Sequence, residues 1–263
     1  MIKKDKSFYA SEEIVYIKEK ISDITNDKQY ITKIQSDLNQ GKVVIFKNYA
    51  SIDEIQNIKR YMSNIKNNTL PKYCPVEYKC HDNFSINFSH PKSTVPSFGY
   101  TFNFFPWNQN IFSFFERFKP IYHLRNLISG IKKNSFIDQP DHECTANIGV
   151  CLFPKGNGFL HTHTDPYDVH QTCVPIMPMS LYGTDFKSGG NFIHISKEKK
   201  LYADQISDPG DIVLFHSLIP HGVELIDPEE TFDPFSDEGR WTILFAVNRF
   251  VTNKKISESK KIP

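Results

Sequence analysis

Residues 159–166 read FLHTHTDP and follow a glycine-containing turn, PKGNG at residues 154–158. The run places two imidazoles and a carboxylate within a few positions of one another. On an extended strand, side chains alternate between the two faces, so His163 and Asp165, two positions apart, point to the same face. We therefore predict a strand here, whose His163 and Asp165 side chains can bind one metal ion.

A third ligand must come from elsewhere, and the best source is PGDIVLFH at residues 209–216, followed by PHGV at residues 220–223. Two histidines compete there. His216 ends an apolar run and has a simpler explanation as a packed side chain, and from the residues alone both histidines stay candidates. Two histidines and one carboxylate form the facial triad of non-haem Fe(II) oxygenases, which leaves positions on the metal open.

The composition is that of an ordinary globular protein. The 263 residues are 39% hydrophobic and 23% charged, and no linker divides them, so we expect one domain over residues 1–263. The formal net charge of +1 indicates no general attraction to nucleic acid or to acidic membranes. No apolar run reaches transmembrane length. Neither nucleic acid nor membrane is therefore expected as a partner, and the oligomeric state is left open.

The N-terminus and the cysteines bear on the compartment. The charged sequence MIKKDK at residues 1–6 leads into no apolar stretch, so a secretory signal is not expected. Five cysteines at irregular spacing are typical of reduced thiols, and we expect a cytoplasmic protein. Cys74, Cys80 and His81 lack a second pair of ligands, which argues against a zinc site.

Helical periodicity dominates the beginning of the chain. Apolar residues recur at helical spacing over residues 11–25 and 28–39, and Gly41 is expected to stop the second helix. The pattern SIDE at residues 51–54 is a capping box and predicts a third helix, which ends before Pro71.

Strands and one further helix are predicted between these helices and the middle of the chain. The β-branched run at residues 43–46 predicts a strand. Residues 71–109 are rich in aromatics without a clean period, although residues 100–104 alternate like a strand. Residues 111–132 look helical, and Pro120 is expected to kink or split that helix.

From about residue 143 the pattern changes to short β runs separated by turns. The expected strands are residues 145–153, 174–181, 191–195, 211–215, 223–226 and 241–247. Helices followed by many short strands indicate an α+β fold with a β-sandwich or barrel core. The Lys- and Ser-rich tail, residues 253–263, is expected to be frayed.

Over roughly residues 145–250 the chain resembles the Fe(II)- and 2-oxoglutarate-dependent dioxygenases, the prolyl-hydroxylase-like and phytanoyl-hydroxylase-like jelly-roll oxygenases. The matching motifs, in chain order, are HTD at 163–165, KSGGNF at 187–192, PGDIVLF at 209–215, HGV at 221–223 and GRWT at 239–242. The resemblance implies an α+β fold with a double-stranded β-helix (jelly-roll) core over residues 143–250. Residues 1–142 would then supply buttressing helices and a lid region.

The resemblance also implies the occupants of the site. Fe(II) would be held by His163, Asp165 and His221, and O2 would use an open position. The co-substrate 2-oxoglutarate would place its distal carboxylate on Arg240, because a planar guanidinium suits a carboxylate. Thr242 would lie on the same strand face as Arg240, and its hydroxyl would bind that same carboxylate, as in the family's Arg-x-Ser/Thr variants.

Several assignments within this picture stay open. Asn147 is a further candidate for the co-substrate site, and His161 and Tyr167 are candidates for substrate contact. Arg249 is an alternative clamp. Arg240 has a simpler explanation as a loop arginine paired with Asp237 or Glu238.

An oxidoreductase that hydroxylates a small-molecule metabolite, with release of succinate and CO2, is the implied function; desaturation or ring closure are variants of it. Asp165 argues against halogenation, since the family's halogenases replace this carboxylate with a small residue. The alternatives are a protein side-chain hydroxylase and a cupin-like metal-binding module without turnover.

Two segments offer hypotheses about the substrate. The aromatic residues 84–107 either cover the mouth of the site or pack between helices and sheet. The segment between His221 and Arg240 carries carboxylates and no Lys or Arg, namely Glu224, Asp227, Glu229, Glu230, Asp233, Asp237 and Glu238. These acidic side chains either favour a cationic substrate or belong to a solvated connection.

Overall fold

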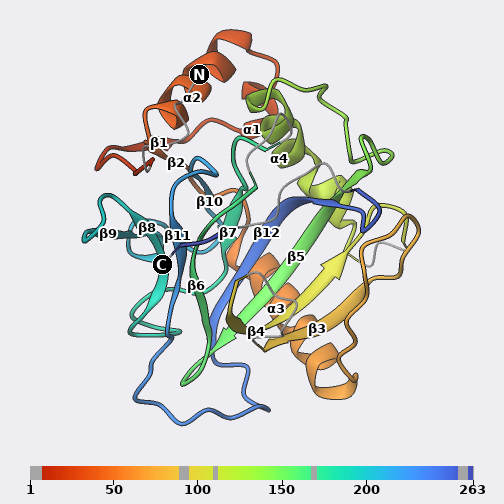
Figure 1. Cartoon of the computed structure of the whole chain (residues 1–263), viewed down its shortest axis with the longest axis vertical. Coiled ribbons are helices and arrows are strands. Elements are labelled where there is room, and N and C mark those ends of the chain that lie inside the picture. Colours follow the sequence, from red (N-terminus) through yellow and green to blue (C-terminus); the bar gives the residue numbers. More distant parts are fainter. Residues whose placement is uncertain (1–7, 89–94, 109–111, 167–170, 254–259, 263) are drawn as a thin grey trace.

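A single curled sheet dominates the computed structural model, which describes residues 8–88, 95–108, 112–166, 171–253 and 260–262 (Figure 1). Within these residues the sheet has 13 strands, and its main path is β1-β2-β10-β7-β12-β5-β4-β6-β11-β8-β9, while β3 pairs with β4 and β13 with β6. The strands are β1 (Ile14–Ile17), β2 (Val43–Phe46), β3 (Asn83–Phe88), β4 (Ser97–Phe104), β5 (Cys144–Pro154), β6 (Phe159–Thr164), β7 (Ile176–Pro178), β8 (Gly190–His194), β9 (Lys200–Tyr202), β10 (Ile212–Leu214), β11 (His221–Glu224), β12 (Gly239–Arg249) and β13 (Lys260–Lys261).

Strand β4 is the point at which the sheet turns back on itself. Its beginning pairs with β6 at Ser97 and Phe98, and its remainder pairs with β5 from Tyr100 to Phe104. The half that contains β12 and β5 therefore faces the half that contains β6, β11 and β8. This is the expected jelly roll, so the predicted fold class is confirmed.

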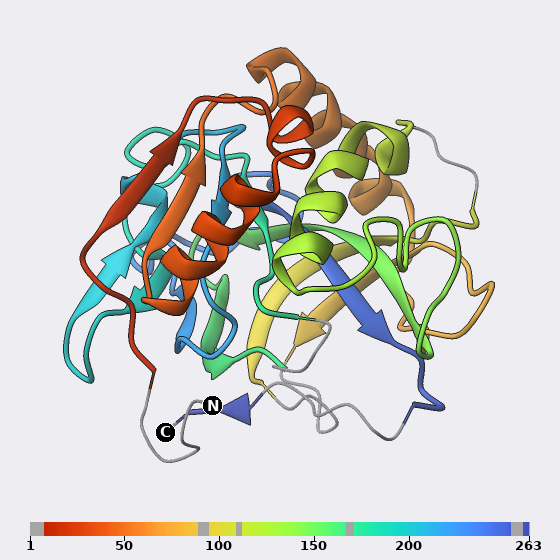
Figure 2. The same cartoon turned by 90° about the horizontal axis from the view of Figure 1, so that it is seen from above.

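The helices gather on one side of the sheet (Figure 2). They are α1 (Ile21–Ile24), α2 (Lys28–Asn39), α3 (Ile52–Asn68) and α4 (Phe114–Ile128), with a 3-10 turn, η1, at Ala203–Gln205. Ile34 of α2, Ile58 of α3 and Phe118 of α4 belong to one buried cluster with Ile148 of β5 and Phe245 of β12. The helices thus cover the outer face of β5 and β12. No helix in the described ranges has both the length and the hydropathy that crossing a bilayer requires.

The alternation along β12 decides which side chains enter the roll. Strand β12 pairs with β5 in an uninterrupted antiparallel register from Gly239 to Arg249. Trp241, Ile243 and Phe245 belong to the cluster that includes the helices. Because strand side chains alternate, Arg240 and Thr242 point to the opposite side, the interior of the roll.

The local signals that predicted α2, β2 and α3 are confirmed. Asp27 begins α2, and its carboxylate accepts hydrogen bonds from the backbone N–H groups of Gln29 and Tyr30. The Ser51 hydroxyl accepts from the Glu54 N–H at 3.2 Å and begins α3. These contacts satisfy N–H groups that a helix cannot pair internally.

The prediction of one helix over residues 11–25 is wrong. Residues Ile14–Ile17 form β1, which pairs in parallel with β2, and only Ile21–Ile24 are helical. The isoleucine spacing fits a helix, but β-branched residues also suit a strand. Residues 14–17 form a strand because they pair with the edge of β2.

The predicted helix over residues 111–132 is shorter than expected and is not split. It runs from Phe114 to Ile128 through Pro120. Proline removes one backbone hydrogen bond from the helix. Phe118, Ile121 and Tyr122 are fully buried around it, and this packing keeps the helix continuous.

Two further expectations change. The aromatic segment is largely β3 and β4, and Phe84, Tyr100 and Phe102 lie in the main core cluster, which favours the packing alternative over a lid. The tail is not frayed where it is described, because β13 pairs with β6 and the Ile262 N–H donates to the Thr162 carbonyl at 3.0 Å.

A substitution at Gly222 of β11 can test whether the close approach of β6 and β11 contributes to stability. A Cβ built on it would lie 2.6 Å from the Leu160 carbonyl oxygen and 2.8 Å from Phe192 Cζ. Gly149 of β5 is a matched strand glycine, whose Cβ would meet nothing closer than 3.7 Å. We expect Gly222→Ala to lower the free energy of unfolding by about 1–3 kcal/mol through overpacking. Gly149→Ala should change it by less than about 1 kcal/mol. Urea denaturation measures both, and equal effects would contradict this account of the β6–β11 contact.

Candidate metal centre

His163, Asp165 and His221 meet in the interior of the roll. His163 lies on β6, His221 begins β11, and the two residues are direct partners across the antiparallel pair. Asp165 follows the end of β6. His163 Nε2 is 3.6 Å from Asp165 Oδ1, and His221 Nε2 is 3.5 Å from Asp165 Oδ2. One ligand atom from each of the three lies within 4.8 Å of the others, and within the described ranges this is the one such group of His, Cys, Asp or Glu.

Both imidazoles are held in the same way. His163 Nδ1 lies 2.9 Å from the carbonyl oxygen of His161, and His221 Nδ1 lies 2.8 Å from that of Ile219. A carbonyl only accepts, so each Nδ1 donates its proton, and each Nε2 carries a lone pair when its ring is neutral. Such an outer hydrogen bond fixes the tautomer and the ring orientation of a metal-binding histidine. The two Nε2 atoms are therefore ready to bind a cation next to Asp165.

His161 does not share the face of His163. The register between β6 and β11 shifts between the pairs His163–His221 and Leu160–Val223, so β6 carries one extra residue there. Such a bulge interrupts the alternation of side chains. The His161 side chain is exposed and packs edge-on against Phe159. Its backbone carbonyl, and not its imidazole, contacts His163. The other substrate candidate, Tyr167, lies outside the described residues.

The charge state of the centre suits a divalent cation. Burial and the neighbouring His163 lower the pKa of His221 to about 4, so this imidazole is neutral near pH 7. Burial by itself would raise the pKa of Asp165, but His221 and His163 lower it overall, so the carboxylate is ionised. Burial by itself would lower the pKa of His163, but Asp165 raises it overall. Two imidazole nitrogens and one carboxylate oxygen, arranged on one side, fit Fe(II) with positions left open.

His216, the competing distal histidine, is occupied elsewhere. It is buried, its ring centre lies 4.7 Å from that of Phe8, and its Nδ1 accepts from the Leu218 N–H at 3.2 Å. It is not part of the group formed by His163, Asp165 and His221. The geometry therefore favours His221.

Arg240 is paired, but not with Asp237 or Glu238, the partners that the alternative explanation gave it. Its Nε and Nη2 donate to the two carboxylate oxygens of Asp204 at 2.6 and 2.9 Å, and both side chains are 2% exposed. Asp237 and Glu238 instead pair with Lys66 and Lys155. The alternative explanation of Arg240, a loop arginine paired with Asp237 or Glu238, is therefore wrong. Asp204 was not identified from the sequence, because no local pattern marks it and the pairing joins distant parts of the chain.

Thr242 and Asn147 are both buried near the same interior face. The Thr242 hydroxyl donates to the Met177 carbonyl at 3.1 Å. The Asn147 side-chain amide donates to the Phe104 carbonyl at 3.4 Å, and the Tyr122 hydroxyl donates to the Asn147 carbonyl at 2.8 Å. Each therefore keeps an oxygen that can accept a further hydrogen bond. Arg249, the alternative clamp, stands at an odd spacing from Arg240 on β12 and so points to the opposite face.

The acidic segment between β11 and β12 lies away from the centre. It leaves β11 after Glu224, at the end opposite His221, and loops around the lower end of the molecule in Figure 1. Asp227 accepts from the backbone N–H groups of Lys187 and Ser188. Glu224, Asp237 and Glu238 pair with lysines. These contacts support a solvated structural connection and not a cationic-substrate site.

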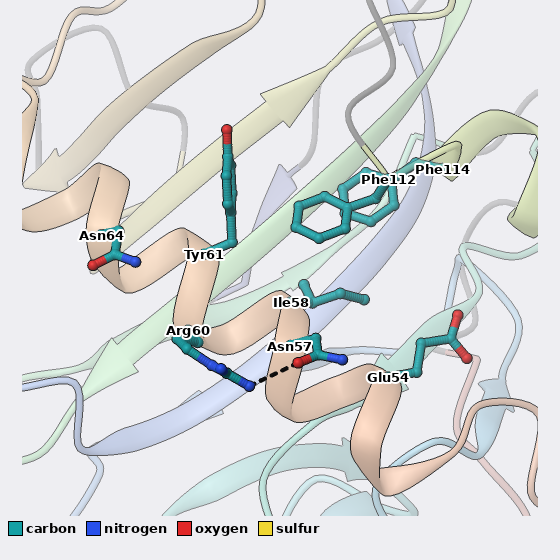
Figure 3. A pocket seen from close by; sticks show the side chains of 8 residues that line it. All are labelled: Glu54, Asn57, Ile58, Arg60, Tyr61, Asn64, Phe112 and Phe114. Carbon is teal, nitrogen blue, oxygen red and sulfur yellow. Dashed lines mark hydrogen bonds between the residues drawn. The ribbon is translucent and has the colours of Figure 1, made fainter.

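A cavity of about 620 Å³ lies beside α3, on the helix side of the sheet (Figure 3). Its walls include Ile58, Tyr61 and Phe112, and Arg60 donates to Asn57 at its rim. None of the three metal-centre residues lines it. The group of side chains that could hold a metal ion lies in the roll instead, outside this cavity.

Comparison with known proteins supports the fold. No protein-family model and no curated protein matches the chain. A Pseudomonas putida prolyl-4-hydroxylase matches with a TM-score of 0.53 and 11% identity, over 83% of this chain and 98% of that one. A full-length Neurospora crassa protein, solved with alpha-KG and thymine, matches with a TM-score of 0.52 and 11% identity, over 93% and 86%. A Trichoplax adhaerens prolyl hydroxylase, solved with a hypoxia inducible factor peptide, matches with a TM-score of 0.50 and 12% identity, over 88% and 94%. At these identities the shared property is the jelly-roll fold.

The choice between His221 and His216 can be tested by metal binding. Changing an outer partner of a metal ligand typically weakens binding by about 10–100-fold. Loss of a ligand should do more, so we expect His221→Ala to weaken anaerobic Fe(II) binding by more than about a hundredfold. His216→Ala should keep wild-type affinity in isothermal titration calorimetry. The opposite pattern would move the distal ligand to His216.

Proposed function

We propose that this protein is an Fe(II)- and 2-oxoglutarate-dependent oxygenase. The observation that carries the proposal is the interior group of His163, Asp165 and His221, with both Nδ1 atoms held by backbone carbonyls and both Nε2 atoms facing the carboxylate. A plain metal-binding module needs no further charge in the roll. The presence of Arg240 on an interior face therefore supports an enzyme with a dicarboxylate co-substrate.

Each residue of the proposed site would have a distinct role in binding. His163, Asp165 and His221 bind Fe(II) through two imidazole nitrogens and one carboxylate oxygen. Arg240 binds the distal carboxylate of 2-oxoglutarate, with the oxygens of Thr242 and Asn147 as additional polar contacts. The bound iron, 2-oxoglutarate and O2 supply oxidation of a substrate C–H bond, with release of succinate and CO2. Burial of His163, His221 and Arg240 strengthens their electrostatic contacts.

A small-molecule metabolite is the proposed substrate, with hydroxylation, desaturation or ring closure as the outcome. Extended peptides often bind by adding a strand to an exposed sheet edge. Around His163, β6 pairs with β11 on one side and with β13 on the other, so the described structure offers no free edge there. The alternative is a protein side chain, as suggested by the peptide bound to the Trichoplax adhaerens enzyme; the thymine bound to the Neurospora crassa protein illustrates the first class. All five cysteines are free thiols, which supports the proposed cytoplasmic location.

Turnover of the co-substrate tests the proposal without knowledge of the substrate. Purified protein with Fe(II), ascorbate and O2 should convert 2-oxoglutarate to succinate slowly, and candidate metabolites that are substrates should accelerate the conversion. His163→Ala, which removes a metal ligand, should abolish it. Mass spectrometry then separates a gain of one oxygen from a loss of two hydrogens. Metal binding without any succinate formation, alone or with metabolite and peptide pools, would favour a non-catalytic module.

Substitution of Arg240 tests the co-substrate site, and the same substitution of Arg249 is its matched control. They lie on opposite faces of β12, and only Arg240 points into the roll. We expect Arg240→Gln to raise the KM for 2-oxoglutarate on the order of a hundredfold, because a buried charge-assisted pair is lost. Its Fe(II) affinity should stay within about twofold of wild type, because iron does not contact the guanidinium. Arg249→Gln should leave both values unchanged. An unchanged KM in Arg240→Gln, with circular dichroism showing a folded protein, would remove Arg240 from the site.

A further inference from the structure

Asp204 approaches Arg240 from one side of the guanidinium. It belongs to η1, the 3-10 turn after β9, and its carboxylate is buried. The contacts to Nε and Nη2 form the parallel two-bond geometry in which arginine and carboxylate pair most specifically. The Asn191 N–H donates to Asp204 Oδ2 at 2.6 Å, so Asp204 is itself fixed by backbone.

Gly190, the second of two consecutive glycines and the first residue of β8, makes room for this contact. Gly190 has φ +108°, and a Cβ on it would lie 2.7 Å from Asp204 Oδ2 and 3.1 Å from Phe186 Cε2. A side chain at this position would therefore push against the carboxylate that holds Arg240. The glycine at residue 190 serves the Asp204–Arg240 pair as well as the turn into β8.

The pairing leaves one end of the guanidinium available. Arginine carries five N–H donors, and Asp204 takes those on the Nε–Nη2 side. Among the residues that the structure describes, no hydrogen bond reaches Nη1. The buried positive charge is compensated before any ligand arrives, so the fold does not carry an unpaired interior cation. The N–H groups at Nη1 can donate to a second carboxylate without rearrangement of Arg240.

We propose that Asp204 is a positioning residue for the co-substrate. It binds Nε and Nη2 of Arg240 and so orients Nη1 toward the distal carboxylate of 2-oxoglutarate. This inference rests on the proposed function and adds to it a residue that acts only through Arg240. It makes a specific claim about selectivity. Asp204 contributes to the binding of a 2-oxo acid that has a distal carboxylate, and contributes nothing to one that lacks it.

The test compares two ligands in three proteins by anaerobic calorimetry with Fe(II) bound. The ligands are 2-oxoglutarate and 2-oxobutanoate, which shares the 2-oxo acid group but has no distal carboxylate. Wild type should bind 2-oxoglutarate more tightly, and Asp204→Asn should reduce that preference by about tenfold or more, the usual effect of losing hydrogen bonds between charged groups. Affinity for 2-oxobutanoate should stay within about twofold.

Asp211→Asn is the control for a purely structural loss. Asp211 is also a buried carboxylate, paired with Lys47 away from Arg240. Its substitution should lower the melting temperature but leave the preference between the two ligands unchanged. If Asp204→Asn does not fold, Asp204→Glu keeps the charge while moving the carboxylate by one methylene, and it should also reduce the preference.

The possible results distinguish failure of the proposed co-substrate from failure of the role of Asp204 alone. Wild type that binds 2-oxoglutarate no better than 2-oxobutanoate would overturn both the proposed co-substrate and the role of Asp204. A wild-type preference that persists unchanged in the folded Asp204 variants would overturn the role of Asp204 alone. A stronger preference in Asp204→Asn would also overturn it, because the carboxylate would then compete with the co-substrate instead of positioning its partner.

Discussion

The pairing of His163 with His221 across β6 and β11 is the contact on which the site depends. It joins two distant segments of the chain and places two imidazoles side by side, with ring centres 4.3 Å apart. The bulge in β6 turns the His161 imidazole away and leaves its carbonyl to hold His163. Gly222 allows the bulged backbone to lie against β11. The β6–β11 pairing that helps to close the roll therefore also brings the two histidines of the centre together.

Asp165 and Arg240 both lie inside the roll, and the charge of each is compensated in a different way. Asp165 is anionic beside two histidines, an arrangement that a divalent cation completes. Arg240 is cationic and is compensated by Asp204. Burying either charge alone would cost several kcal/mol, so these partners are part of the fold as well as of the proposed chemistry. The large cavity beside α3 has no comparable group of reactive side chains, which is why volume is a poor guide to the site here.

The sequence predicted those features that depend on local patterns or on ordered motifs. The Ser51 cap, the apolar stripe of α2 and the run containing His163 and Asp165 each carry their signal within a few residues. Features that depend on distant pairing were missed or misassigned: residues 14–17 form a strand because β2 offers an edge, β13 pairs with β6, and Asp204 contacts Arg240 from the 3-10 turn η1. The acidic residues Asp237 and Glu238 could not be assigned from sequence because their lysine partners lie on α3 and in the turn after β5.

A crystal structure with Mn(II) in place of Fe(II), grown with 2-oxoglutarate, tests the central claim most directly. The account predicts an anomalous peak bonded to His163 Nε2, His221 Nε2 and an Asp165 oxygen. It also predicts 2-oxoglutarate chelating that metal, with its distal carboxylate on Nη1 of Arg240 while Asp204 keeps its two bonds. A metal bound outside this group of residues, or a co-substrate anchored by a residue other than Arg240, would contradict it.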